Sequence, residues 1–138
     1  MISVKNSVGR LCLARFAPPL DVAQVDHLAA EIRGILGRLA RPSIFCSDTR
    51  RVQIFAPDVS DRILAMLRAD NPRVERSAVV VGDSSVFALQ MERIFRESNN
   101  PGRKVFRSVD TIVAWLDEAL TPPEREGLRA FLDEDLVA

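Results

Sequence analysis

The sequence predicts an α/β domain in which helices cover a mostly parallel mixed sheet of about five strands. Short β-type runs alternate along the chain with longer segments whose apolar residues recur at spacings of three and four. The run at residues 77–81 (SAVVV) is apolar after its first residue, which is typical of a strand that is covered on both faces. Strands that alternate with helices favour parallel pairing through right-handed crossovers.

The first two runs, ISVK and RLCLARF, predict a hairpin, and Gly9 is expected in the turn between them. Pro18 and Pro19 end the second run. Asp21 then acts as the N-cap of the first helix, and Gln24 completes a capping box three residues later. The apolar stripe of this helix consists of Val25, Leu28, Ala29, Ile32, Ile35, Leu36 and Leu39.

The next part of the chain holds a strand, an irregular stretch and a second helix. Residues 43–46 (SIFC) form the predicted strand, and residues 47–56 (SDTRRVQIFA) are the least regular stretch between two elements. This connection is longer than the roughly two to six residues that usually join a strand to a helix. Pro57 suits the first turn of the second helix, which Asn71 and Pro72 end. The inner face of this helix carries Val59, Ile63, Met66 and Leu67.

Two more helices and a short strand complete the predicted sheet and its cover. A turn at residues 99–102 (NNPG) leads into a last strand at residues 104–106. The helix before this turn has its apolar face at Phe87, Met91, Ile94 and Phe95. Ser108 is the expected cap of the helix after it, which holds Val109, Ile112, Val113, Leu116 and Leu120, with Trp115 on its flank.

A fifth helix follows a second capping signal, Thr121 to Glu124 (TPPE). We therefore expect a domain at residues 1–120 and a C-terminal helical extension at residues 121–138. The apolar stripe of the extension is too large to stand in water, so the helix is expected to pack on the domain or on a second copy of the chain. This stripe consists of Leu128, Phe131, Leu132 and Leu136.

Composition indicates an ordinary globular protein. Of the 138 residues, 47% are apolar and 28% are charged, with nineteen basic residues against nineteen acidic ones. This balance gives no overall attraction to nucleic acid or to an anionic membrane, and no apolar run is long enough to insert into a membrane. The N-terminal residues lack the apolar core of a signal peptide, so a cytoplasmic location is expected. Cys12 and Cys46 lie in apolar runs and are interpreted as reduced core residues.

The residues Gly82-Asp83-Ser84 match the start of a hydrolase motif, in which the serine is a nucleophile. A nucleophilic serine needs a base, normally a histidine. The one histidine of the chain, His27, lies far upstream in the first helix, whereas such hydrolases carry theirs downstream. We therefore interpret Ser84 as a helix cap. No histidine pair, carboxylate pair or phosphate-binding glycine loop indicates a catalytic residue, a metal or a cofactor, and the chain is not expected to be an enzyme.

Charge is distributed unevenly in the second half of the chain. Residues 93–107 hold five basic residues against Glu97, whereas residues 117–138 hold seven acidic residues against two basic ones. The two regions could pack on one another, join two subunits, or leave the basic one to meet an anionic partner. Solubility alone would also explain charged helix surfaces. Few aromatic residues lie among the basic ones to stack bases, so nucleic acid is not an expected partner. The basic residues are Arg93, Arg96, Arg103, Lys104 and Arg107.

Element order and three local phrases resemble the SpoIIAA-like branch of the STAS proteins, which are relatives of bacterial anti-sigma factor antagonists. The phrases are DNPRVERSAVVV (70–81), FALQMERIFRE (87–97) and RKVFRSVDTIVAWL (103–116). The resemblance covers residues 1–120. It implies a STAS-like domain that serves as a bacterial regulatory module, usually without enzymatic activity. Such antagonists switch by phosphorylation of a serine in a D-S-S/T-G motif after the third strand. Here that turn reads CSDTR (46–50), which lacks the Asp-Ser order and the glycine.

These observations favour a non-enzymatic module whose partner is another protein, or a second copy of the chain in a homodimer. The alternative is a small-ligand or lipid-binding module, because SpoIIAA-like domains resemble the CRAL-TRIO lipid carriers in fold. That alternative requires a large apolar cavity.

The functional surface is expected at residues 47–60, because open α/β sheets bind ligands at the carboxyl ends of their strands. Arg50 and Arg51, beside Asp48, can pair with carboxylates or phosphate, and Ile54 and Phe55 can supply an apolar anchor. Alternatively, Val52, Ile54 and Phe55 pack in the core or form an extra edge strand. Phosphorylation of a hydroxyl in this segment would add negative charge beside the two arginines and reorder it. The candidate hydroxyls are those of Ser47 and Thr49.

Overall fold

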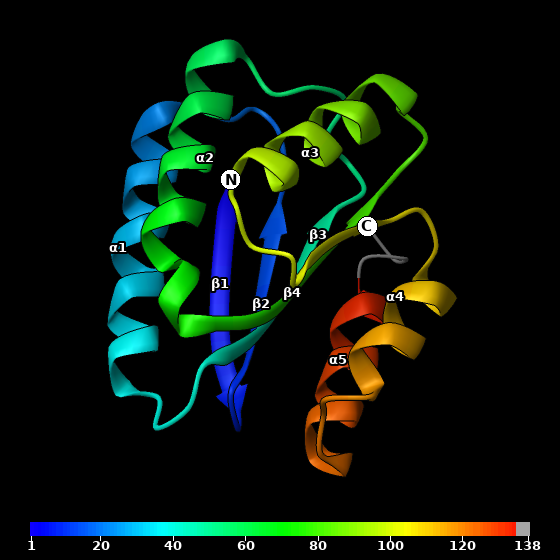
Figure 1. Cartoon of the computed structure of the whole chain (residues 1–138). Coiled ribbons are helices and arrows are strands. Elements are labelled where there is room, and N and C mark those ends of the chain that lie inside the picture. Colours follow the sequence, from blue (N-terminus) through cyan, green and yellow to red (C-terminus); the bar gives the residue numbers. More distant parts are fainter. Residues whose placement is uncertain (135–138) are drawn as a thin grey trace.

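A five-stranded sheet forms the centre of the protein, as the computed structural model of residues 1–134 shows (Figure 1). The strands follow one another across the sheet in chain order, and only the first runs antiparallel to its neighbour. The α/β class and the mixed, mostly parallel sheet are therefore confirmed. The strands are β1 (Ile2–Val8), β2 (Leu11–Phe16), β3 (Ser43–Thr49), β4 (Val74–Val81) and β5 (Arg103–Phe106).

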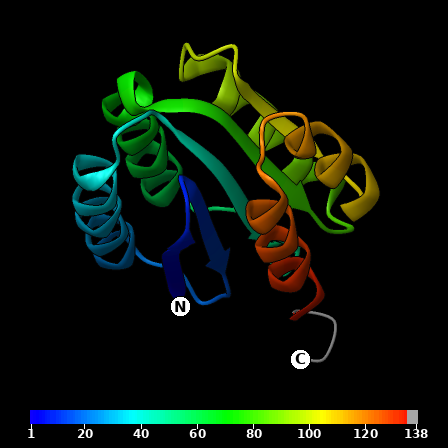
Figure 2. The same cartoon turned by 90° about the horizontal axis from the view of Figure 1, so that it is seen from below.

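Helices cover both faces of this sheet (Figure 2). The first three pack on one face, and the last two pack on the other. A short 3-10 helix at Asn71–Arg73 leads from the second helix into β4. The helices are α1 (Val22–Arg38), α2 (Pro57–Asp70), α3 (Ser85–Glu97), α4 (Val109–Asp117) and α5 (Pro122–Glu134).

The local signals in the sequence start the elements as expected. Asp21 and Gln24 form the capping box of α1, with the Gln24 amide 2.8 Å from the Asp21 carboxylate. Ser108 caps α4 by accepting a hydrogen bond from the Thr111 amide. Gly9 turns the hairpin between β1 and β2 with a positive φ of 53°, a conformation that glycine adopts without a steric penalty.

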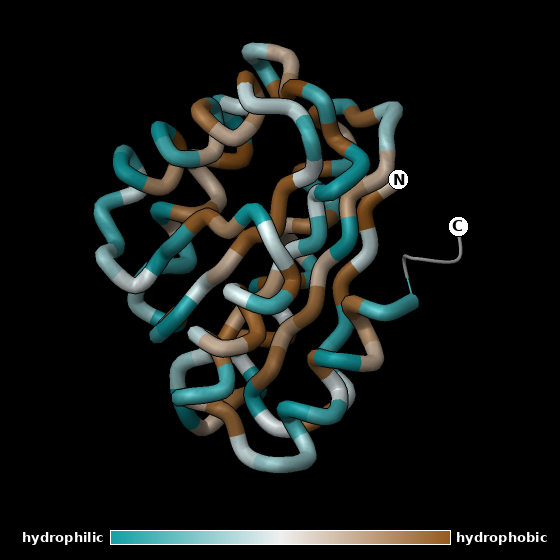
Figure 3. Tube along the Cα trace, turned by 90° about the vertical axis from the view of Figure 1, so that its right-hand side faces the viewer, coloured by the Kyte–Doolittle hydropathy of each residue, from teal (hydrophilic) through white to brown (hydrophobic). Residues whose placement is uncertain are grey.

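The central strands are buried on both faces, as the apolar run of β4 predicts. Along β4, Ala78 and Val80 face α4 and α5, whereas Val79 and Val81 face the other three helices. Figure 3 shows hydrophobic residues concentrated along the strands, with hydrophilic residues alternating on the helices. This two-sided burial fixes the register, because a slip by one residue would exchange the two faces.

The two cysteines lie on opposite faces of the sheet. Cys12 packs with α1, α2 and α3, and Cys46 packs with α4 and α5. Both are fully buried and unpaired. Burial raises the pKa of the Cys12 thiol to about 12, and burial next to Asp48 raises the pKa of Cys46 as well. Both thiols therefore stay protonated, as expected for structural cysteines.

Several boundaries differ from the sequence prediction, among them the start of β4 and the end of α4, and the end of β3 matters most for the site. β3 does not end at Cys46 but continues through Ser47, Asp48 and Thr49. These residues pair with strands on both sides, Asp48 opposite Arg15 on β2 and Thr49 opposite Val81 on β4. The polar side chains break the apolar pattern that predicts a strand, although the backbone of these residues pairs with β2 and β4. The irregular connection is therefore shorter than predicted and covers residues 50–56.

The fifth helix packs on its own chain. Leu128, Phe131 and Leu132 are buried against the face of the sheet that α4 also covers. The prediction that this helix packs is confirmed for these residues, and Leu136 lies outside the described residues. α5 thus completes the second helix layer.

Candidate functional site

The carboxyl ends of the parallel strands lie at the end of the sheet where α3 begins (Figure 1). Two connections leave β3 and β4 there, residues 50–56 and residues 82–84. All five partner-binding residues predicted from the sequence belong to the first connection or to the strand end before it. The structure separates them into an ion cluster and a loop that lies on α3.

Asp48 is the centre of the ion cluster. Its side chain is nearly inaccessible, at 2% exposure, and it accepts three hydrogen bonds from Arg50, from Nε at 3.0 Å, from Nη2 at 2.9 Å and from the backbone amide at 3.1 Å. Arg15 on β2 adds a fourth, from Nε at 3.3 Å. Burial acts to raise the pKa of Asp48, but the hydrogen bonds and charge of Arg50, helped by Arg15, outweigh burial and hold the pKa below its usual value.

Both arginines also reach the C-terminal end of α5. Arg50 Nη2 donates to the Leu132 carbonyl at 2.8 Å, and Arg15 Nη2 donates to the Phe131 carbonyl. The Arg15 guanidinium also lies 4.1 Å from the centre of the Phe131 ring. Carbonyls in the last turn of a helix lack intrahelical donors and favour cations. Arg50 and Arg15, both hydrogen-bonded to Asp48, therefore join α5 to the sheet in this structure.

The connection after the cluster turns one predicted anchor inward and leaves the other outside. Phe55 is buried, with its ring edge-on to Phe87 at 4.9 Å between centroids. Ile54 is 54% exposed, and Arg51 is exposed as well. Val52 is also buried. Val52 and Phe55 thus pack in the core, as one alternative from the sequence held. The hypothesis of an exposed apolar anchor applies to Ile54 alone.

Side chains of α3 and of its N-cap hydrogen-bond to this connection. The Gln90 side chain accepts a hydrogen bond from the Phe55 amide at 2.9 Å and donates one to the Phe55 carbonyl at 3.0 Å. Ser84 caps α3 by accepting from the Phe87 amide at 3.1 Å, and its hydroxyl donates to the Gln53 carbonyl at 2.8 Å. The interpretation of Ser84 as a helix cap is therefore confirmed.

Gly82 allows the backbone before Ser84 to approach the first residue after β3 closely. A Cβ atom at Gly82 would lie 2.2 Å from the Arg50 carbonyl oxygen, a distance that no side chain tolerates. The glycine that made residues 82–84 look like a hydrolase motif therefore serves close packing. The single histidine, His27, is exposed on α1 and pairs with Glu31 at 3.2 Å.

Exposed apolar side chains lie on both of these hydrogen-bonded segments. Ile54 lies between Gln53, which is bonded to Ser84, and Phe55, which is bonded to Gln90. On the helix, Val86 and Leu89 lie between Ser84 and Gln90. Val86 is 62% exposed and Leu89 is 63% exposed. We call Ile54, Val86 and Leu89 the α3 surface. The stripe of Phe87, Met91, Ile94 and Phe95 already indicates that Val86 and Leu89 lie off the inner face, but no local pattern reveals Gln90.

The two candidate phosphorylation sites lie in β3 and not in a turn. Thr49 is buried, and its hydroxyl donates to the Val80 carbonyl at 2.9 Å. Ser47 is half-buried and lines a cavity beneath the sheet. Their placement differs from the exposed turn that the STAS resemblance implies.

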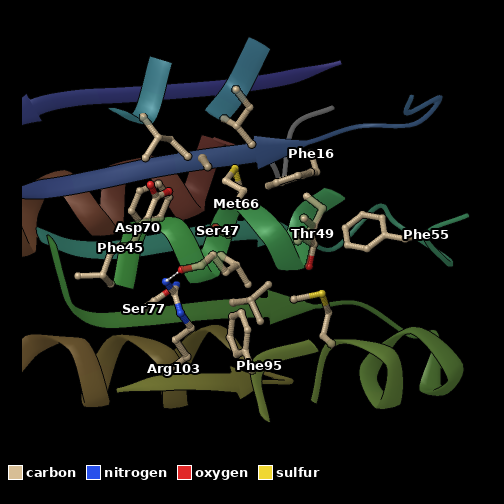
Figure 4. A pocket seen from close by; sticks show the side chains of 18 residues that line it. Phe16, Phe45, Ser47, Thr49, Phe55, Met66, Asp70, Ser77, Phe95 and Arg103 are labelled. Carbon is tan, nitrogen blue, oxygen red and sulfur yellow. Dashed lines mark hydrogen bonds between the residues drawn. The ribbon is translucent and has the colours of Figure 1, made fainter. Parts of the chain in front are cut away.

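This cavity lies between the sheet and the first three helices (Figure 4). Its volume is about 40 Å³, and apolar side chains such as Phe16, Phe45 and Met66 form most of its wall. A single water needs roughly 10–15 Å³, and pockets for drug-sized ligands measure about 300–1,000 Å³. A lipid would therefore fit only if helices moved away from the sheet.

Two charged groups stand at one end of the cavity. Burial raises the pKa of Asp70 to about 6, against the opposing charges of Arg103 and Arg33. Burial also lowers the pKa of Arg103 to about 10, against the charge of Asp70. Arg103 Nη2 donates to the Leu67 carbonyl and to Asn71 Oδ1, both at 3.0 Å, so this guanidinium ties β5 to the end of α2.

Within residues 1–134, no group of three or more His, Cys, Asp or Glu side chains is placed to hold a metal ion. No helix in the described part of the chain has the length and apolar character needed to cross a membrane. Comparisons of the chain with family models, with curated proteins and with solved structures found no match. The resemblance to STAS-like domains stays a prediction.

Proposed function

We propose that this protein is a non-enzymatic interaction module that binds another protein through the α3 surface. The observation that carries the proposal is that Ile54, Val86 and Leu89, each more than half exposed, lie on two hydrogen-bonded segments at the carboxyl ends of the strands. Open α/β sheets meet their ligands at this end. Burial of three large apolar side chains would supply a small, strong centre for a protein contact.

The rigidity of the surface supports the same proposal. Gln90 and Ser84 fix the backbone on both sides of Ile54, and Val86 and Leu89 belong to a capped helix. A surface ordered before binding loses little conformational entropy in the complex. Three side chains are few for an obligate dimer, which buries roughly 800 Å² or more per subunit. We therefore favour a transient complex with a different protein over a permanent homodimer.

We further propose a STAS-like regulatory role in a bacterial cytoplasm. The alternation of strands and helices agrees with what the resemblance implies, and the two buried thiols suit a reducing compartment. The switch in this proposal is not phosphorylation of Thr49, because its hydroxyl is buried and bonded within the sheet.

The proposal is tested with Val86→Asp/Leu89→Asp, which places two charges on the α3 surface. Ala30→Asp/Ala65→Asp is the matched control, because it adds the same charges at exposed positions of α1 and α2. Proteins crosslinked to each variant in cells of the native host are identified by mass spectrometry after circular dichroism confirms the fold. A partner that the parent and the control retain and the surface variant loses supports the proposal. The proposal is wrong if all three proteins recover the same partners, or if the parent is a stable dimer that the surface variant dissociates.

A further inference from the structure

The last strand of the sheet, β5, has a free side. The sheet order places β5 beyond β4, and no further strand follows it in the described part of the chain. The Ser77 amide donates to the Gly102 carbonyl at 2.9 Å, and Val79 lies opposite Val105. Because a parallel pair bonds through alternate residues, this register directs the amide and carbonyl of Val105 away from β4. An edge strand of this kind can pair with an added strand.

A shallow hollow of about 610 Å³ lies beside this edge. Its apolar floor is formed by Phe106 on β5 and Trp115 on α4, both half-buried, with 5.5 Å between their ring centroids. In an added strand, alternate side chains point to the same face, so one of them would enter this hollow while the backbone pairs with Val105.

The charge around the hollow is positive. Lys104 Nζ lies 5.6 Å from the Phe106 ring centre and 5.8 Å from that of Trp115, and Arg107 is exposed on the rim. The one acidic side chain of the lining, Glu118, is paired with Arg76 at 3.3 Å. Among the ion pairs of residues 1–134, none includes Lys104 or Arg107.

The positive charge and the aromatic pair also decide which kind of molecule can bind at the edge of β5. A second copy pairing through its own β5 would bring Lys104 and Arg107 of both chains onto one short edge, where like charges repel. Single-stranded nucleic acid would need a free ring face for stacking, but the Arg76 guanidinium lies 4.9 Å from the centre of the Trp115 ring. An acidic peptide avoids the repulsion, and its apolar side chain can pack beside the two rings without stacking on a free face of Trp115.

We infer that the free edge of β5 binds an extended acidic segment of a partner protein. The segment adds a strand beside Val105, places an apolar side chain over Phe106 and Trp115, and directs carboxylates toward Lys104 and Arg107. This site is distinct from the α3 surface. The experiment below tests it independently of the function proposed for the α3 surface.

The chain carries its own reporter, because Trp115 is its one tryptophan. The probe is a capped peptide of roughly eight residues in which one central valine is flanked on both sides by glutamates, a length that spans a short strand. A matched peptide with lysine in place of glutamate and an oligothymidylate are the comparison ligands. We expect a saturable change in Trp115 fluorescence with the acidic peptide alone, and weaker binding at higher salt.

Two variants test separately whether binding depends on the positive charges and whether it depends on backbone pairing with β5. Lys104→Glu/Arg107→Glu should weaken binding by roughly tenfold or more, because two exposed ion pairs become repulsive. Arg33→Glu/Arg38→Glu on α1 makes the same change in net charge and should bind like the parent. Val105→Pro removes the amide on the free edge, a position where proline is tolerated, and should abolish binding with the fold retained.

Circular dichroism checks the fold of each variant. If the proline variant does not fold, the charge variants decide the result alone. The proposal is overturned if the acidic peptide gives no saturable change or if the Lys104→Glu/Arg107→Glu protein binds it as the parent does. It is also overturned if the lysine peptide or the oligothymidylate binds as tightly as the acidic peptide.

Discussion

Asp48 and Arg50, two residues apart at the end of β3, form a two-bonded ion pair whose guanidinium also holds the C-terminal end of α5. The pair joins the centre of the sheet to a helix that begins more than seventy residues later in the chain. A motif expected to recognise a partner therefore holds the protein together.

Asp48→Ala should destabilise the protein by about 2–4 kcal/mol, because the largely buried guanidinium groups of Arg15 and Arg50 would lose the carboxylate that accepts hydrogen bonds from both. Urea unfolding monitored by circular dichroism measures the change. Asp58→Ala, at an exposed position of α2, is the control and should cost much less. A loss below that of the control would show that water replaces the carboxylate without penalty.

The same pair predicts an acid-sensitive stability. The pKa of Asp48 is lower in the folded protein than in the unfolded chain, so its contribution is complete above the unfolded pKa. The contribution is lost as the pH falls through the folded pKa. The difference in melting temperature between the parent and Asp48→Asn should therefore be large at pH 7 and should shrink at acid pH below the ordinary aspartate pKa of about 4. A difference that stays constant would contradict this assignment.

Asp70 should show the opposite dependence. Its folded pKa, about 6, lies above the ordinary value because burial disfavours the carboxylate. The folded state binds its proton more tightly, so the parent loses stability as the pH rises from about 4 to about 6. Asp70→Asn should remove this loss and stabilise the protein at pH 7 by an amount on the order of 1 kcal/mol. Melting curves at pH 4.5 and pH 7 provide the measurement, and equal stabilisation at both would refute it.

Ser84 has two roles that substitutions can separate. Ser84→Ala removes the cap of α3 and the bond to Gln53, and should cost about 1 kcal/mol or slightly more. Ser84→Asp keeps an acceptor for the Phe87 amide but offers no hydrogen to the Gln53 carbonyl. We expect Ser84→Asp to retain the stability of α3 while the amide of Ile54 exchanges faster with solvent. An esterase activity lost in Ser84→Ala with the fold intact would instead restore the nucleophile hypothesis.

Removal of α5 tests its part in the fold. A chain ending at Leu120 loses the three buried side chains Leu128, Phe131 and Leu132 and uncovers Leu11 and Leu13 on β2. We expect it to melt at a lower temperature and to self-associate in sedimentation experiments. A melting temperature and sedimentation coefficient equal to those of the full chain would show that α5 adds nothing to stability.

Local signals made most of the fold predictable. Asp21, Ser84 and Ser108 start helices through hydrogen bonds that span only three residues, so the sequence pattern contains the complete interaction. The end of β3 could not be predicted in this way, because the partners of Asp48 on β2 and α5 are far away in the chain. The same holds for the site. The sequence indicates Ile54 as a surface residue, but the bonds from Gln90 to the neighbouring Phe55 form only because two elements meet in space.

The placement of Cys12 and Cys46 on opposite faces of the sheet provides a separate kinetic probe for each helix layer. A thiol reagent can reach Cys12 only when α1, α2 or α3 moves off the sheet, and it can reach Cys46 only when α4 or α5 does. Labelling rates of the single variants Cys12→Ser and Cys46→Ser would therefore show which layer opens first. A ligand bound at β5 should slow the labelling of Cys46 more than that of Cys12, because α4 forms part of that site.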